Sequence, residues 1–108
     1  MTFELFTSSV KTKKQLEGLP APLKALWLDG AGDWEGAHAA VQDEHTRSAA
    51  VVHAYLHRKE GDLWNARYWY KQAGRKPAEG PLQAEWDALV REFLKSADLG
   101  PGSQAATL

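Results

Sequence analysis

The sequence contains no cysteine, a single methionine and no apolar run that approaches the ~20 residues needed to span a bilayer. The absence of cysteine excludes disulfides, thiolate metal sites and cysteine nucleophiles. The N-terminal stretch MTFELFTSSVKTKK lacks the basic start and long apolar core of a signal peptide. We therefore expect a cytoplasmic protein.

An excess of charge of one sign is also missing, because 13 Lys and Arg residues stand against 14 Asp and Glu residues. Such a chain has no strong field to attract nucleic acid or an anionic membrane, and we predict neither as a partner. With 108 residues, the chain is long enough for one domain and too short for two ordinary ones.

Strand patterns are scarce, and only Phe3 to Phe6 hints at an extended segment. Helix signals are frequent. Pro20 and Pro22 mark the start of a helix, since the N–H that proline lacks has no partner in a first turn. Gly30 ends this helix, and Asp33 is a suitable N-cap for the next one.

Three further helices are predicted from the same kinds of start and stop residues. The first runs from about Thr46 to Glu60 and ends at Gly61, the second covers 63–73, and a longer one covers 82–94. These patterns predict an all-α fold of about five to six helices, arranged as stacked antiparallel hairpins. The predicted organisation is an N-terminal segment that packs on or leads into the domain (1–19), a helical domain (20–97) and a flexible tail (98–108).

The chain repeats itself when it is shifted by 29 positions. The shift aligns four pairs of residues: Ala25 with Ala54, Gly32 with Gly61, Asp33 with Asp62, and Ala37 with Ala66. In each copy glycine ends one helix, aspartate begins the next, and alanine lets the two backbones approach. A repeated helix pair of this kind buries its apolar face only against a neighbour.

The segment AYLHRKEGDLWNARYWYKQAG resembles the inner part of a tetratricopeptide repeat, with Gly61, Ala66, Tyr70 and Ala73 in the signature places. The period of 29 is shorter than that family's usual ~34 residues. The resemblance implies stacked helical hairpins and carries little information about function.

Residues 23–94 are also similar to a group of small proteins with a tetratricopeptide-like fold, for which the resemblance implies no activity. The matching residues are Gly32, Asp33, Ala37, His38, His53, Ala54, Leu56, His57, Arg58, Glu60, Gly61, Asp62, Asn65, Ala66, Tyr68, Trp69, Tyr70, Ala73 and Gly74.

His53 and His57 lie four residues apart on the predicted 46–60 helix, on a flank beside its apolar arc. Imidazoles at this spacing can share one metal ion, with His38 or Glu60 as the third ligand. The pattern lacks the glutamate that follows the first histidine in a metalloprotease helix. We therefore favour structural histidines that hydrogen-bond across the hairpin, and we predict no metal and no cofactor.

Arg58 and Arg67 flank the predicted turn at 61–62. Two guanidinium groups near a histidine pair would suit a carboxylate or phosphate ligand, whereas pairing with local acids is the structural alternative. Asn65 either joins such a site or bonds to nearby backbone. The candidate ligand-binding residues are His53, His57, Arg58, Asn65, Arg67, Tyr68 and Trp69.

Aromatic residues are unusually dense on the predicted 63–73 helix. Trp64, Tyr68, Trp69 and Tyr70 point in several directions, so no single buried stripe accommodates all four. Either several neighbours surround this helix, or some of the rings line a binding surface. We assign Trp64 and Tyr68 to partner binding.

The sequence offers no G-x-S-x-G elbow and no glycine-rich phosphate loop, so catalysis is the less favoured function. The leading hypothesis is a non-catalytic module that binds a protein or peptide, with self-association as one form of this function. The alternative is a small-molecule or metal site, or a small enzyme, built from His53, His57, Arg58 and Arg67.

Overall fold

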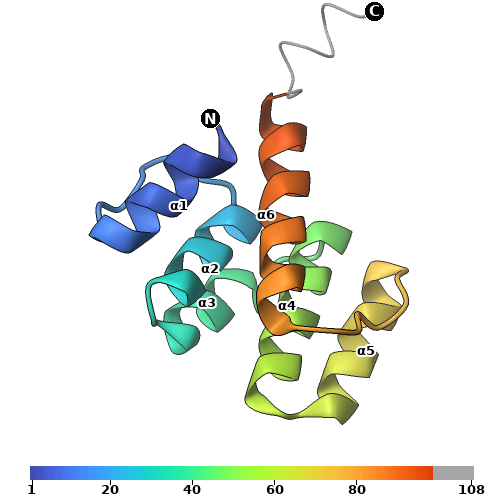
Figure 1. Cartoon of the computed structure of the whole chain (residues 1–108). Coiled ribbons are helices and arrows are strands. Elements are labelled where there is room, and N and C mark those ends of the chain that lie inside the picture. The colour runs from blue at the N-terminus through green and yellow to red at the C-terminus, as the bar shows by residue number, and fades with distance from the viewer. Residues whose placement is uncertain (99–108) are drawn as a thin grey trace, which may run out of the picture.

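The computed structural model describes residues 1–98 and contains six helices and no strand within them (Figure 1). The prediction of an all-α fold with about five to six helices is confirmed. The helices are α1 (Phe3–Thr12), α2 (Ala21–Gly30), α3 (Trp34–Val41), α4 (Arg47–Glu60), α5 (Leu63–Ala73) and α6 (Leu82–Asp98). None of them combines the length and the apolar character that a bilayer crossing requires.

Polar caps fix the helix boundaries that the sequence predicted. The Asp33 carboxylate accepts a hydrogen bond from the third backbone N–H of α3, and Asp62 does the same for α5. Thr46 caps α4 in the same way. At the other end of α4, Gly61 adopts a φ of 86°, which favours glycine because a Cβ would crowd its own backbone there. These short connections place α3 beside α2 and α5 beside α4.

The N-terminal segment is a helix, so the hint of an extended piece at Phe3 to Phe6 was wrong. Thr2 caps α1 by accepting a hydrogen bond from the backbone of Leu5. Phe6 and Val10, four residues apart, then face the core, where α1 packs on α2 and α6. The helical period overrides the short apolar alternation because it buries Phe6 completely.

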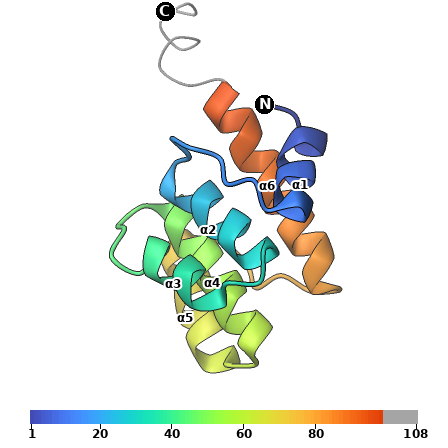
Figure 2. The same cartoon turned by 90° about the vertical axis from the view of Figure 1, so that its left-hand side faces the viewer.

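Helix α4 lies at the centre of the molecule and contacts α2, α3, α5 and α6. Figure 2 shows α2 and α3 lying in front of it. Every residue from Ala49 to His57 is buried. His53 and His57 are therefore inside the protein, rather than on a flank beside an apolar arc as the helical wheel indicated.

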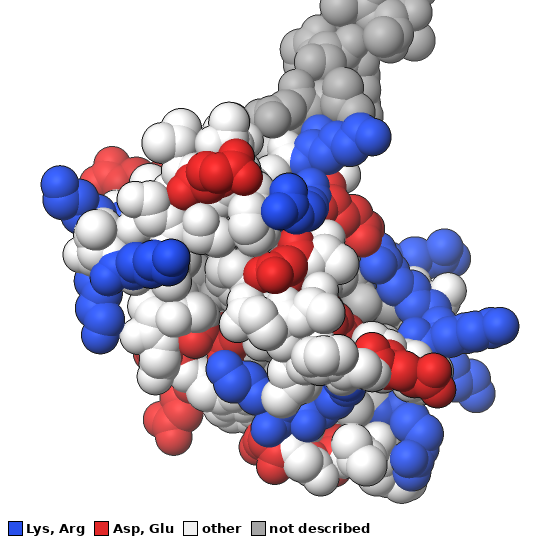
Figure 3. All heavy atoms as spheres, viewed as in Figure 1, with Lys and Arg blue, Asp and Glu red and all other residues white. Residues whose placement is uncertain are grey.

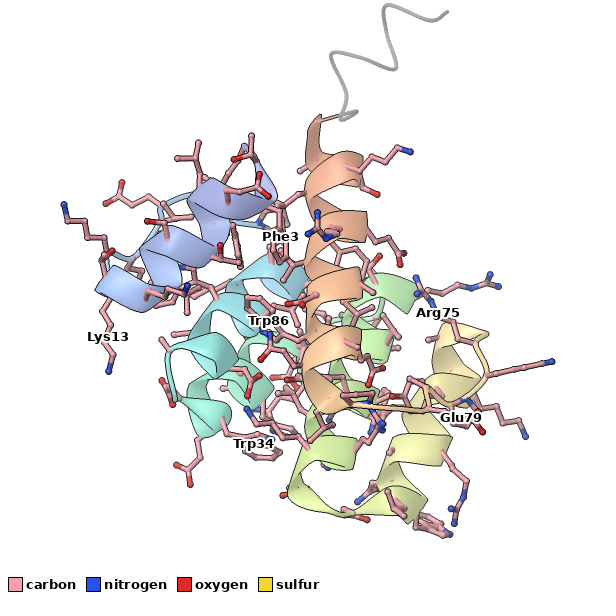
Figure 4. All side chains as sticks on the ribbon, viewed as in Figure 1. Phe3, Lys13, Trp34, Arg75, Glu79 and Trp86 are labelled. Carbon is pink, nitrogen blue, oxygen red and sulfur yellow. The ribbon has the colours of Figure 1, made fainter. Side chains whose placement is uncertain are left out.

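Helix α6 closes the core opposite α3. The indole N–H of Trp86 donates to the backbone carbonyl of Leu26 at 2.9 Å, and Phe6 contacts the same indole ring. Trp86 lies where α2 and α6 meet (Figure 4). Gly30 permits this approach, because a Cβ there would lie 2.9 Å from the ring of Trp86. Most of the predicted tail (98–108) lies outside the described residues.

Candidate functional site

Three histidines from two helices meet at one point beside α4. His38 comes from α3, and His53 and His57 come from adjacent turns of α4. The Nε2 atoms of His38 and His53 are 2.9 Å apart, which is a hydrogen-bond distance. One ring nitrogen from each of the three histidines lies within 4.8 Å of the other two. We call these three residues the histidine cluster.

Two tryptophans enclose the cluster. The ring of Trp69 from α5 stacks on His53, with centroids 4.0 Å apart and planes inclined by 15°. Trp34 stacks on His38 at 5.1 Å and donates its indole N–H to the carbonyl of Leu56, so it bridges α3 and α4 (Figure 4). Flat aromatic neighbours hold the imidazoles in place and restrict their exposure to water.

Glu60 orients the third ring of the cluster. Its Oε1 atom lies 2.7 Å from Nδ1 of His57, three residues earlier on α4. When the ring is neutral, Nδ1–H donates to the carboxylate, and Nε2 keeps its lone pair. Metal-binding histidines in proteins characteristically donate their second N–H to a carboxylate in this manner.

The environment favours neutral imidazoles. Burial lowers the pKa of His53 to about 4, and the neighbouring His38 and His57 contribute to this decrease. Burial is also the main cause that lowers the pKa of His38, followed by repulsion from His57, while Glu60 acts in the opposite direction. Both rings are therefore neutral at pH 7 and offer lone pairs.

One fully buried nitrogen of the cluster has no hydrogen-bond partner. Nδ1 of His53 is buried and is the one such side-chain atom found within residues 1–98. A histidine kept only for structure usually satisfies both ring nitrogens when it is buried. The packing of His53 is thus governed by its other nitrogen and by the stack on Trp69.

Arg58 does not join the cluster. Its guanidinium pairs with Glu85 of α6 at 3.0 Å and also donates to the carbonyl of Gly80. Glu85 in turn accepts a hydrogen bond from the hydroxyl of Tyr70 at 2.6 Å. The structural alternative considered from the sequence was pairing with a local acid; Arg58 does pair with an acid, but Glu85 is 27 residues away and lies on a different helix.

The other candidate residues on α5 divide into two groups. Asn65 donates its side-chain amide to Asp62, which it also meets through the helix cap, so it completes the turn between α4 and α5. Arg67, Tyr68 and Trp64 are exposed on the outer side of α5. Of the α5 candidates, Trp69 alone is brought to the histidine cluster.

A separate cavity of about 420 Å³ lies between α1, α2, α4 and α6, away from the cluster. Its wall includes the buried carboxylate of Asp29, which accepts hydrogen bonds from the Tyr55 hydroxyl at 2.8 Å and from Lys59 at 2.9 Å. Burial and the adjacent Asp29 raise the pKa of the Tyr55 hydroxyl, so this hydroxyl stays protonated. Both carboxylate oxygens are satisfied, and the group serves to join α2 to α4.

Two members of the site were absent from the predicted ligand-binding set. His38 was recognised in the sequence only as one of two options for a third ligand, and Trp34 was not among the candidate site residues. The signal for His38 was its place four residues after Trp34, on the same side of α3. Comparisons of the chain with protein-family models, curated proteins and solved structures find no match.

Proposed function

We propose that the protein binds a divalent transition-metal ion, with Zn²⁺ as the first ion to test, through His38, His53 and His57. The observation that carries this proposal is the convergence of one ring nitrogen from each residue within 4.8 Å. The sequence alone favoured structural histidines and no metal; the position of His38 is the reason for preferring the other alternative.

The spacing of the nitrogens suits a metal after small ring movements. Three nitrogens bound to Zn²⁺ at its usual bond length lie about 3.3 Å apart in a tetrahedral arrangement. The closest pair in the cluster is separated by 2.9 Å, and the others by no more than 4.8 Å. Metal binding therefore requires the Nε2 atoms of His38 and His53 to move apart by about 0.4 Å, and any longer separation in the cluster to shorten toward the same value.

The chemistry of the ligands selects the kind of ion. Neutral imidazoles suit Zn²⁺, Cu²⁺, Ni²⁺ and Co²⁺, whereas Mg²⁺ and Ca²⁺ require oxygen ligands. Three protein ligands leave a fourth coordination position for water or a small exogenous ligand, which distinguishes such a centre from a closed structural site. Glu60, hydrogen-bonded to His57, supplies the outer-shell carboxylate.

Hydrogen bonding across the helices accounts for only part of the arrangement. The bond between His38 and His53 links α3 to α4, as a structural role requires. It does not include His57, whose ring nevertheless lies 4.9 Å from that of His53 and 5.2 Å from that of His38, measured between centroids. A shared metal ion explains why all three rings converge.

Binding of Co²⁺ and Zn²⁺ to the chelator-treated protein tests the proposal. We expect one ion per chain and visible Co²⁺ absorption bands typical of low coordination number, which Zn²⁺ abolishes. His38→Gln should weaken binding by more than the roughly 10–100-fold that loss of an outer-shell partner costs. The control is His45→Ala, because His45 is exposed and lies outside the cluster.

Two results would contradict the proposal. One is the absence of saturable Zn²⁺ binding to a folded wild-type protein. The other is an equal loss of binding in His38→Gln and His45→Ala, which would place the ion on surface histidines instead of the cluster.

A further inference from the structure

The outer side of α5 exposes large apolar side chains that the fold leaves uncovered. Trp64 is 71% exposed, Leu63 is 55% exposed and Tyr68 is 47% exposed. Exposed tryptophan and tyrosine side chains are typical of binding hot spots, because they bury a large area against a partner at little entropic cost. None of these three residues belongs to the histidine cluster, and Tyr68 reaches it only indirectly, through an edge-on contact with Trp69, whose ring stacks on His53.

The helical period separates a buried side of α5 from this exposed one. Ala66, Tyr70 and Ala73 are buried, and α5 packs principally on α4. On the opposite side, Trp64 and Tyr68 form one row at a spacing of four residues, and Arg67 and Lys71 form a second row beside it. We call these four residues together with Leu63 the α5 outer face.

The path of the chain explains why the α5 outer face is free. After Ala73 the chain leaves α5 and enters α6, which packs on α1, α2 and α4. Figure 1 shows α5 at the edge of the molecule, with α6 directed away from it. No other helix within residues 1–98 covers the side of α5 that carries Trp64.

Positive charge gathers on this side of a chain that carries a net charge of −1. The segment 63–80 holds four cations, Arg67, Lys71, Arg75 and Lys76, against the single acid Glu79. Figure 3 shows this gathering of Lys and Arg side chains at the right of the molecule, around α5. Arg75 pairs with Glu92, whereas Arg67 and Lys71 form no salt bridge within the described residues.

We propose that the α5 outer face binds an acidic, amphipathic helical segment of a partner protein. The apolar residues of that segment cover Trp64 and Tyr68, and its carboxylates pair with Arg67 and Lys71. The two parallel rows match a helix that carries apolar and acidic residues at i and i+4.

The positive charges of the α5 outer face make a second copy of this chain an unfavourable partner. A symmetric pairing of two α5 outer faces places Arg67 and Lys71 opposite the same cations of the other copy. The repulsion between these cations offsets the free energy gained by covering Trp64. An acidic partner is instead attracted by Arg67 and Lys71. Its association rate should fall at high salt, because salt screens this attraction.

Selection from a random displayed peptide library identifies the partner chemistry directly, since the library covers acidic, basic and neutral sequences alike. We expect the enriched peptides to be acidic and amphipathic, and to bind the whole chain less tightly at high salt. Trp64→Ala combined with Tyr68→Ala should reduce their affinity by about tenfold or more. Arg67→Glu should reduce it as well and should select basic peptides instead.

The matched control combines Leu5→Ala with Lys24→Glu, which alters an exposed leucine and an exposed lysine on α1 and α2. This control should keep full affinity, and thermal melting should show that all variants are folded. The proposal is overturned if no acidic peptide is enriched or if the selected peptides bind the Trp64→Ala, Tyr68→Ala variant equally well. Tighter binding of a single-stranded oligonucleotide than of any selected peptide overturns it too.

Discussion

The Nε2 atoms of His38 and His53 lie 2.9 Å apart across the contact between α3 and α4. With both rings neutral, one Nε2 carries a hydrogen and the other accepts it, so the two helices share a single proton at this point. Protonation of both rings would place two donors against each other. In the proposed metal complex, the ion replaces the shared proton and draws His57 into the same contact.

The stability of the metal-free protein should fall as pH decreases from 6.5 toward 4. The folded protein holds the pKa of His53 at about 4, whereas the unfolded chain has the ordinary value of 6.5. Above pH 6.5 both states are neutral and this group causes no pH dependence. Between the two values the unfolded state binds more protons, so unfolding becomes easier, by about 2 kcal/mol at pH 5 and about 3 kcal/mol once pH falls below 4.

Urea denaturation in the presence of a chelator, at pH values from 7 to 5, measures this effect before most carboxylates titrate. His45→Ala should keep the same slope, and His53→Gln should reduce it, while the lowered pKa of His38 retains a smaller dependence of the same sign. An unchanged free energy of unfolding between pH 7 and pH 5 would show that His53 titrates normally in the folded state.

Replacement of Glu60 by glutamine should weaken Zn²⁺ binding while leaving the fold intact. The amide still meets Nδ1 of His57, but it lacks the charge that raises the basicity of the ring. We expect a loss of roughly 10–100-fold in affinity, measured by competition with a chromophoric chelator. Glu35→Gln on the exposed side of α3 is the matched control. Equal Zn²⁺ affinities of the two variants would show that Glu60 does not contribute to metal binding.

Helix identity and helix ends could be read from the sequence, because both are set by local residues. Asp33, Asp62 and Gly61 determine where helices start and stop through their own backbone geometry. The helix at Phe3–Thr12 was missed because its evidence is tertiary: Phe6 is recognised as a core residue only when α2 and α6 surround it.

The candidate site could be predicted only in part for a similar reason. The spacing of His53 and His57 placed them together on one helix, and both lie on α4. Whether His38 or Glu60 would join them depended on how α3 packs on α4, which no local pattern determines. Arg58 was grouped with the histidines because its partner Glu85 is 27 residues away, on a helix whose position the sequence did not indicate.

The pairing of Arg58 with Glu85 should contribute strongly to stability. Both side chains are largely buried, with exposures of 15% and 7%. Arg58→Ala leaves the Glu85 carboxylate without its cation, so we expect a loss of about 3–5 kcal/mol in the free energy of unfolding. Arg75→Ala, which breaks an exposed pair with Glu92, should cost no more than about 1 kcal/mol.

The Arg58→Ala variant also separates a structural role of Arg58 from a ligand-binding one. Zn²⁺ affinity should be the same in wild type and Arg58→Ala under conditions where both are folded. A large loss of metal affinity without a loss of stability would show that Arg58 contributes to the metal site.

The turn at Gly61 should tolerate asparagine better than alanine. A Cβ at this position meets no atom within 4 Å, so the cost of a substitution comes from the backbone alone, which has a φ of 86°. Gly61→Ala should lower the free energy of unfolding by about 1–2 kcal/mol, because alanine rarely adopts the left-handed region. Gly61→Asn should cost less, since asparagine visits that region more readily. Urea denaturation of the two variants measures the difference, and equal stability of wild type and Gly61→Ala would mean that the turn between α4 and α5 has another conformation in solution.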